Sequence, residues 1–177
     1  VHRDVKPANA MLTGSGRAIL MDFGLVRDND ATMLTKAGHV VGTPRYLAPE
    51  MLRGKDASSG TDLWALGAMF YELLTGRQAF PGDSMMEMAR AIVKDDPVPP
   101  STLKPGLPES LDQLMSELLC KDPEARLYDA KIAIARLEEV LHDHGLPPPK
   151  PARRTARPRA LSAPAASDPA AVSSGSL

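Results

Sequence analysis

Stretches of apolar and polar positions divide the chain into a short hairpin, a long loop and a series of helices. Apolar runs at 11–13 and 17–21 flank a Gly-Ser-Gly turn at 14–16, whose glycines allow positive φ, and this pattern predicts a β-hairpin. Residues 25–47 lack sustained periodicity and are rich in Thr, Gly, Asp and Asn, which is typical of a loop. Loops of this length inside compact domains are usually functional or disordered.

From Thr61 the apolar spacing becomes helical, with apolar residues on nearly every face. A helix that is hydrophobic all round is buried, and Gly76 provides a C-terminal stop. The main stripe consists of Leu63, Leu66, Gly67, Phe70, Leu73 and Leu74. We therefore expect one buried helix in this region.

Three amphipathic helices are predicted further along the chain. Ser84 and Glu87 have capping-box spacing, and the helix that follows should lie on the surface with its methionines packed into a core. Residues 96–108 hold five prolines and should form a loop. The three stripes are Met85, Met88, Ala89 and Ile92, then Leu111, Leu114, Met115 and Leu118, and last Ala130, Ala133, Ile134, Leu137 and Leu141, which ends near Gly145.

The composition changes after these helices. Residues 147–177 are dominated by Pro, Ala, Ser and Arg, and they carry five basic side chains against one acidic one, a formal charge of +4. Such a segment cannot offset the entropy of ordering, so we expect a folded domain over residues 1–146 and a disordered tail or linker over 147–177. The basic cluster in the tail leaves contact with an acidic partner or a membrane surface open, although a solvated tail is the simpler interpretation.

Charge and cysteine content exclude several classes of function. The whole chain has a formal charge of −1, so residues 1–146 carry −5 and lack the basic footprint of a nucleic-acid-binding domain. Cys120 is the single cysteine and cannot form an internal disulfide, and we expect it to be a small buried hydrophobe in an apolar helix. No apolar run is long enough to span a bilayer.

Three short motifs indicate the chemistry. They are the run His2-Arg3-Asp4-Val5-Lys6-Pro7-Ala8-Asn9, then Asp22-Phe23-Gly24, and then Ala48-Pro49-Glu50. In this order they resemble the catalytic loop, metal-binding turn and activation-segment end of a protein kinase. Phosphoryl transfer needs a base, metal ligands and a substrate platform in one cleft, which is why the order is as informative as the motifs themselves.

The resemblance implies a role for each motif residue. Asp4 would orient or accept the proton of the substrate hydroxyl, and Lys6 would place a positive charge beside the transferred phosphate. The remaining implied residues are Asn9 and Asp22 as Mg²⁺ ligands that also hold ATP, Met11 beneath the adenine ring, and Thr43 in contact with Asp4 and Lys6. The spacing of Asp4, Lys6 and Asn9, together with Thr43, is similar to that of serine/threonine kinases, so the expected cofactors are ATP and Mg²⁺ and the expected acceptors are Ser and Thr hydroxyls of proteins.

Other positions match structural features of the same family. Asp62 resembles the buried aspartate that anchors the catalytic-loop backbone, with a helix-cap residue as the simpler alternative. Glu50 and Arg126 resemble a buried ion pair, against the alternative of a surface pair. Arg3 would bind a phosphorylated Thr32 or Thr35, which is a hypothesis because exposed threonines are usually plain loop residues.

The resemblance covers residues 1 to about 144. It implies a mainly α fold, the carboxy-terminal lobe of a bacterial, eukaryotic-like serine/threonine kinase with a short β-hairpin at the cleft. The glycine-rich loop, strand lysine and partner glutamate of an amino-terminal lobe are not found in this sequence, so we expect the isolated segment to be inactive. A noncatalytic binding module that presents the helix at 84–94 is the alternative. The expected location is cytoplasmic, with a membrane anchor elsewhere in a longer protein left open.

Overall fold

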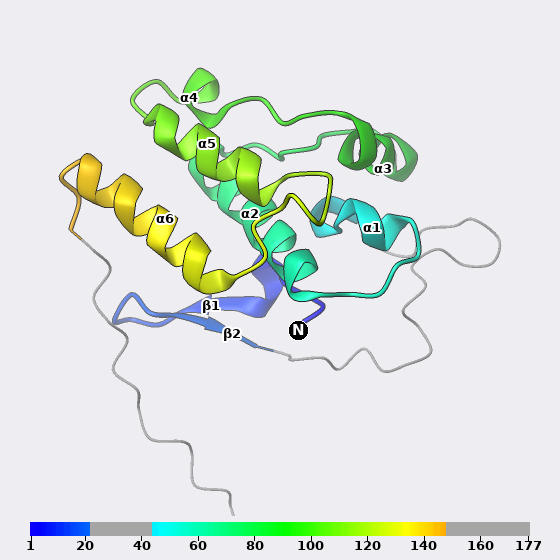
Figure 1. Cartoon of the computed structure of the whole chain (residues 1–177), viewed down its shortest axis with the longest axis horizontal. Helices are drawn as coiled ribbons and strands as arrows, with labels where there is room; N and C mark the ends of the chain where they lie inside the picture. Colours follow the sequence, from blue (N-terminus) through cyan, green and yellow to red (C-terminus); the bar gives the residue numbers. More distant parts are fainter. Residues whose placement is uncertain (22–43, 148–177) are drawn as a thin grey trace, which may run out of the picture.

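A computed structural model describes residues 1–21 and 44–147, and over these residues the protein is mainly α-helical with one small antiparallel sheet (Figure 1). The elements are the 3₁₀ turn η1 (Pro7–Asn9), strands β1 (Ala10–Leu12) and β2 (Ala18–Leu20), the 3₁₀ turn η2 (Pro44–Tyr46), and helices α1 (Pro49–Leu52), α2 (Ser59–Thr75), α3 (Met85–Lys94), α4 (Pro100–Leu103), α5 (Glu109–Leu118) and α6 (Ala130–Asp143). The mainly α fold class with a short hairpin is confirmed.

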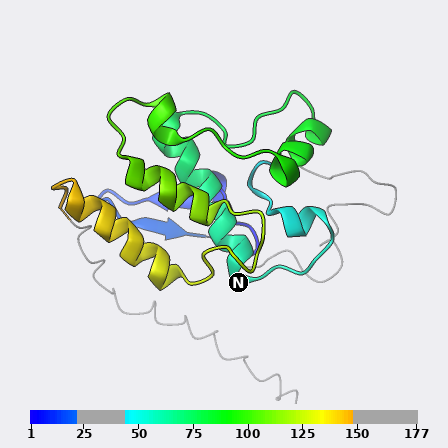
Figure 2. The same ribbon diagram turned by 45° about the horizontal axis from the view of Figure 1, so that its top comes forward.

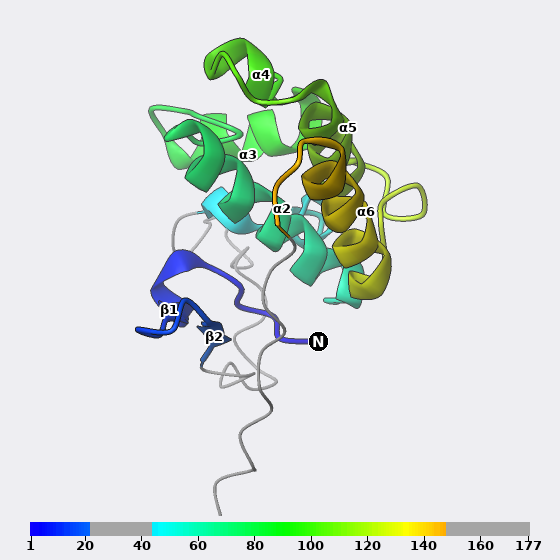
Figure 3. The same cartoon turned by 90° about the vertical axis from the view of Figure 1, so that its left-hand side faces the viewer.

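Helix α2 is the central element of the arrangement. Helices α4 and α5 and the turn η2 pack against α2, and α6 packs against α5. Figure 2 shows α5 and α6 side by side, with α2 crossing behind them. The hairpin lies on the opposite side of the molecule from α4 and α5, as Figure 3 shows. The segment that leads into the hairpin therefore lies at one edge of the helical body.

The predicted hairpin is confirmed. Residues of β1 and β2 pair in the register Ala10↔Leu20, Met11↔Ile19 and Leu12↔Ala18. Gly16 has φ +79° in the connecting turn, a left-handed conformation that glycine adopts without a steric penalty. Because the N–H of Met21 also donates to the carbonyl of Asn9 at 2.8 Å, both ends of the ribbon are held at its base.

The predicted central helix is confirmed as α2, but its burial differs from the expectation. Trp64 is fully buried, and a Cβ on Gly67 would come within 2.8 Å of the Cβ of Leu118, so α5 approaches α2 closely at this glycine. By contrast, Leu66 and Leu73 are 40% and 74% exposed, so the prediction of burial on all faces was wrong for these two residues. Among the described residues, α4, α5 and η2 cover only part of the helix circumference.

Both ends of α2 are capped, although the sequence predicted only the end at Gly76. Ser58 and Thr61 form a reciprocal capping box at the N-terminus, and Gly76 closes the helix in the left-handed conformation with φ +71°. Both features satisfy backbone groups that the helix itself leaves unpaired at its ends. The predicted stop at Gly76 is confirmed.

Helix α3 begins at the predicted cap, where the Ser84 side chain accepts the N–H of Glu87 at 3.2 Å. In a capping box the Glu87 carboxylate would accept the N–H of Ser84. Here it accepts the N–H of the preceding residue, Asp83. Met85 is 45% exposed, so its predicted core position was wrong, while Ile92 is fully buried. The helix is ten residues long and packs against η2 and α1.

The predicted stripe of α5 is confirmed, since all four of its apolar residues are buried. The proline-rich segment before it contains the single-turn helix α4, which corrects the expected loop and follows from the tolerance of proline at a first helical position. In α6 the expected core residue Ile134 is 55% exposed and Val140 is buried instead. Ala133 and Leu137 of the predicted stripe do pack against the core, so the predicted inward face of α6 is confirmed in part.

Cys120 is half-buried and follows the C-terminal end of α5, so the expectation of a buried helical cysteine is corrected. The predicted tail falls almost wholly on residues 148–177, which lie outside the described residues, and the predicted boundary at 146/147 stays a prediction. Among the helices that the structure describes, none combines the length and apolar character needed to cross a bilayer.

A lysine lies within the aromatic part of the core. Trp64 and Phe80 stack with their ring centroids 5.4 Å apart, and the ammonium of Lys121 lies 3.8 Å from the Phe80 centroid and 5.0 Å from that of Trp64. This ammonium also donates to the Ile92 carbonyl at 2.8 Å. Burial lowers the pKa of Lys121 to about 8, against an opposing effect of nearby carboxylates.

This lysine makes stability depend on pH. Above about pH 8 the folded protein loses a proton from Lys121 that the unfolded chain still holds, so the free energy of unfolding should rise with pH. We expect a rise of about 1–2 kcal/mol between pH 7 and 9.5, after allowance for the partial exposure of the side chain. Urea denaturation at a series of pH values measures it.

The matched variants are Lys121→Met, which should remove the rise, and Lys104→Met at an exposed lysine, which should keep it. The series stops at pH 9.5 because the pKa values of Tyr46 and Tyr71 are raised, first of all by burial. Their ionisation in the unfolded chain would lower stability above about pH 10. An identical pH slope in the wild type and Lys121→Met would contradict the assignment.

Candidate functional site

The loop at residues 2–9 is anchored by helix α2. The two carboxylate oxygens of Asp62 accept the backbone N–H groups of His2 at 2.6 Å and Arg3 at 2.8 Å. The His2 ring contacts the Met21 carbonyl through Nε2 at 2.9 Å, which ties the loop to the end of the hairpin. The predicted backbone anchor is therefore confirmed, although Asp62 is half-buried and not fully enclosed.

Arg3 shows why this anchor matters. Its φ of +72° lies in the left-handed region, and it is the one non-glycine residue with positive φ among those described. A non-glycine residue in this region costs roughly 1–3 kcal/mol and persists only where the surroundings enforce the conformation. The two hydrogen bonds to Asp62 provide that enforcement, and the resulting turn carries the next residue, Asp4, to the surface of the cleft.

Three of the predicted site residues form one cluster. The Lys6 ammonium lies 2.8 Å from Oδ2 of Asp4, and the Asn9 amide donates to the same Oδ2 at 2.7 Å and to the Asp4 carbonyl at 2.8 Å. Asn9 is buried, whereas the side chains of Asp4 and Lys6 are 32% and 40% exposed. The turn η1 brings the three groups together because it folds the chain back between Lys6 and Asn9.

The remaining predicted site residues are not part of this cluster. Met11 lies on β1 with 46% of its surface exposed, and its adenine contact stays a prediction. Asp22 and Thr43 lie outside the described residues, as do Thr32 and Thr35.

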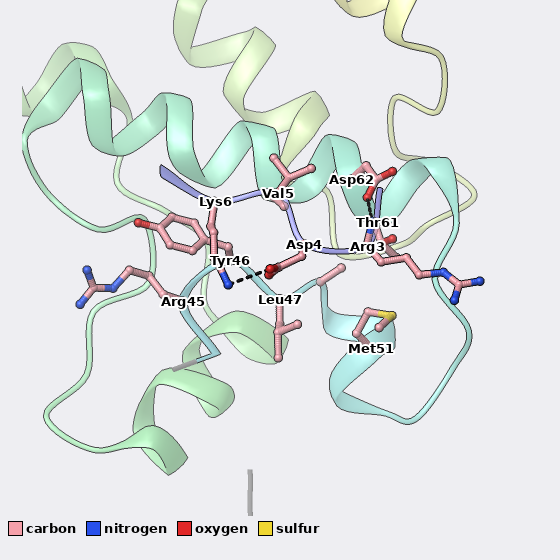
Figure 4. Close-up of a pocket in the computed structure, with 12 residues that line it drawn as sticks. Arg3, Asp4, Val5, Lys6, Arg45, Tyr46, Leu47, Met51, Thr61 and Asp62 are labelled. Carbon is pink, nitrogen blue, oxygen red and sulfur yellow. Dashed lines mark hydrogen bonds and ion pairs between the residues drawn. The ribbon is translucent and has the colours of Figure 1, made fainter. Parts of the chain in front are cut away.

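A pocket of about 420 Å³ opens beside the cluster (Figure 4). In Figure 4, Asp4 lies at its centre between Lys6 on one side and Arg3 on the other, and Leu47 and Met51 face it from the opposite wall. The complete lining is Arg3, Asp4, Val5, Lys6, Arg45, Tyr46, Leu47, Ala48, Met51, Thr61, Asp62 and Ala65. The pocket therefore combines an apolar wall with charged groups.

The wall formed by η2 was missed by the sequence reasoning. The Tyr46 hydroxyl donates to Oε2 of Glu72 at 2.7 Å, and Nη1 of Arg45 lies 3.7 Å from Oε1 of the same carboxylate. Burial, and then the Glu72 carboxylate, raise the pKa of Tyr46, so the phenol remains a donor near neutral pH. The sequence did contain one indication that these two residues belong to the site, because Arg45 and Tyr46 lie between Thr43 and the motif at 48–50.

The predicted buried ion pair is confirmed. Nη1 and Nη2 of Arg126 donate to the two oxygens of Glu50 at 2.6 and 2.8 Å, and both residues are buried. Arg126 also donates to the carbonyls of Cys120 and Gly60. The pair fixes α1 to α2 and to the segment after α5, and α1 carries the pocket residue Met51.

Comparisons with known proteins agree with the motifs. The protein kinase domain family matches residues 1–140. The chain is 40% identical over 152 residues to serine/threonine-protein kinase PknB of Mycobacterium leprae, covering 85% of this chain and 24% of the relative. It is 35% identical over 175 residues to PknA of Mycobacterium tuberculosis, covering 99% of this chain and 38% of the relative. The chain thus spans about a quarter of the length of the PknB relative.

Proposed function

The chain belongs to the protein kinase family, and on that premise we propose that it is the carboxy-terminal lobe of a serine/threonine protein kinase. The complete enzyme would transfer the γ-phosphoryl group of ATP to Ser and Thr hydroxyls of proteins. The observation that carries the proposal is the cluster of Asp4, Lys6 and Asn9 at the edge of a pocket formed by the segment that follows Thr43. Phosphoryl transfer depends mainly on positioning and electrostatic stabilisation, and this cluster supports both.

Asp4 is suited to orient a hydroxyl. Its Oδ2 is already bound by Lys6 and Asn9, which fixes the carboxylate and leaves Oδ1 without a hydrogen-bond partner among the described residues. A Ser or Thr hydroxyl in the pocket would donate to this oxygen, so the attacking oxygen would be held in one orientation. A fixed acceptor of this kind is what a general base requires.

Lys6 would act beside the transferred phosphate. Its ammonium is 40% exposed and close to Asp4, so it can contact an anion in the pocket without a change in the loop backbone. A lysine ammonium is a compact point charge that suits phosphate. Thr43, the predicted third member, stays a prediction because it lies outside the described residues.

The residues present fit a magnesium nucleotide. The side-chain N–H groups of Asn9 donate to Asp4, so its side-chain carbonyl oxygen remains as a hard metal ligand. Asp22 would supply a carboxylate ligand. Among the described residues, no cluster of three or more His, Cys, Asp or Glu side chains could form a metal site by itself. A Mg²⁺ ion bound to nucleotide phosphates does not require such a cluster, because it needs only one or two protein ligands. The ion would neutralise charge on the phosphates.

The proposed reaction takes place in the cytoplasm, where ATP is available. The unpaired Cys120 fits a reducing compartment. The proposed partners are protein substrates and ATP, with no nucleic acid, because the part of the sequence before the tail is acidic.

Transfer of ³²P from labelled ATP by the complete gene product tests the function. We expect phosphate on serine and threonine and none on tyrosine, measured by phosphoamino-acid analysis. Lys6→Gln should lower kcat by about 10²-fold, because charge stabilisation at the moving phosphate is lost. The exposed Lys55→Gln is the matched control and should keep full activity. Transfer to tyrosine alone, or none by the wild type, would contradict the proposal.

A further inference from the structure

Arg45 occupies an unusual position in the pocket. It lines the cavity from the η2 side, and its side chain is 35% exposed. Its contact with Glu72 is 3.7 Å long, which allows electrostatic attraction but is too long for a hydrogen bond. The Nε–H of Arg45 is buried without a hydrogen-bond partner among the described residues. The guanidinium therefore lies beside Glu72 and Tyr46 at the pocket wall, and its one ion pair among the described residues is the long contact with Glu72.

The carboxylates in and around the pocket are bound mainly by groups other than Arg45. Oε2 of Glu72 is occupied by the Tyr46 hydroxyl. Oδ2 of Asp4 is occupied by Lys6 and Asn9, and both oxygens of Asp62 accept backbone N–H groups. Among the described residues Arg45 thus has no close carboxylate partner, and the planar N–H donors of an arginine match a carboxylate in bidentate geometry.

The cations lie at the ends of the pocket. Figure 4 shows the guanidinium of Arg45 beyond Lys6 at one end and that of Arg3 at the other. Arg3 has no ion pair among the described residues. The side chains between them, Leu47 and Met51 on one wall and Val5 on the other, are apolar. An extended peptide lying across Asp4 would place its flanking side chains near the cationic ends.

We propose that Arg45 determines substrate specificity and selects protein segments that carry an acidic residue close to the Ser or Thr acceptor. This inference rests on the proposed function and names the substrate class of the same site. The acidic side chain of the segment bonds to the Nη donors of Arg45, while the acceptor hydroxyl lies at Asp4.

Peptide binding to the 177-residue chain tests the proposal without phosphoryl transfer. The probes are a short peptide with one serine flanked by glutamates and its counterpart with glutamines in their place. The methyl signals of Met51 and Leu47 in NMR titrations report binding, because both side chains line the pocket. We expect the glutamate peptide to bind about tenfold more tightly at low salt, and this preference to shrink at high salt.

Two variants isolate Arg45. Arg45→Gln should abolish the preference and leave the weaker affinity for the glutamine peptide unchanged, while Arg53→Gln, at an exposed arginine outside the pocket lining, should keep it. Unchanged thermal unfolding of both variants excludes loss of the fold. Equal affinities for the two peptides in the wild type, a preference that persists in Arg45→Gln, or no binding of either peptide would overturn the proposal. Failure of the kinase function is a separate result, since it is measured by transfer from ATP in the complete gene product.

Discussion

Replacement of Arg126 by leucine is expected to lower the free energy of unfolding by about 3–5 kcal/mol. The change would leave Glu50 buried and charged, because both of its carboxylate oxygens depend on the Arg126 guanidinium. It would also leave the carbonyls of Cys120 and Gly60 without this donor. A loss of this size is a large share of the roughly 5–15 kcal/mol that stabilises a typical domain.

Urea denaturation followed by tryptophan fluorescence measures this effect well. Trp64 is the single tryptophan, and the Arg126 guanidinium lies 5.0 Å from its ring centroid, so the probe is inside the affected region. The matched control is Arg136→Leu, which removes an exposed arginine with long contacts to Glu117 and Glu139 and should cost less than about 1 kcal/mol.

The double variant Glu50→Leu with Arg126→Leu separates two causes of the loss. If an uncompensated buried charge dominates, removal of both partners should restore more than half of the lost stability. If the hydrogen bonds to Cys120 and Gly60 dominate, the double variant should be as unstable as Arg126→Leu alone. A single Arg126→Leu variant within about 1 kcal/mol of the wild type would show that the pair is not a structural anchor.

The sequence predicted the main elements where periodicity and local stop signals agree. The hairpin, α2 with its end at Gly76, and the four buried residues of α5 follow from spacing and turn chemistry alone. The contact of Glu50 with Arg126, 76 residues apart, does not follow from periodicity and came from the family resemblance. Local patterns therefore predicted individual helices and strands, and the family resemblance predicted the ion pair that joins two distant segments.

The errors have a common physical reason, which is that periodicity shows where apolar residues recur but not which neighbour covers them. Leu73, Met85 and Ile134 lie on predicted apolar stripes, yet they are exposed because no described element covers them. The single turn α4 was missed because a segment rich in proline usually breaks helices, whereas Pro100 occupies a first helical position, where it is tolerated.

The residues of the candidate site also fall into two groups, those that a local motif predicts and those that only packing brings together. Asp4, Lys6 and Asn9 are close in sequence, so one turn of chain is enough to bring them together, and the motif predicted them. Arg45, Tyr46 and Glu72 meet only through the packing of η2 on α2, which no local pattern encodes. The residues proposed to select substrates are thus harder to predict from sequence than those proposed to carry the reaction.

Replacement of Asp4 by asparagine should lower kcat of the complete gene product by about 10³-fold, within the range for removal of a general base. Asparagine has nearly the same shape and keeps one oxygen that can accept hydrogen bonds from Lys6 and Asn9, so the loop should remain folded. Stability should change by less than about 1 kcal/mol, since the ion pair with Lys6 is partly exposed. Steady-state phosphotransfer and urea denaturation measure the two quantities.

The pattern of kinetic constants identifies the role of Asp4. If Asp4 orients the acceptor hydroxyl, KM for ATP should stay within about twofold while kcat falls, because the carboxylate then acts only in the chemical step. The matched control Asp56→Asn, at an exposed aspartate outside the pocket lining, should leave both constants unchanged. Normal phosphotransfer by Asp4→Asn would remove this carboxylate from the mechanism, whereas no phosphotransfer by the wild-type gene product would favour the noncatalytic binding module.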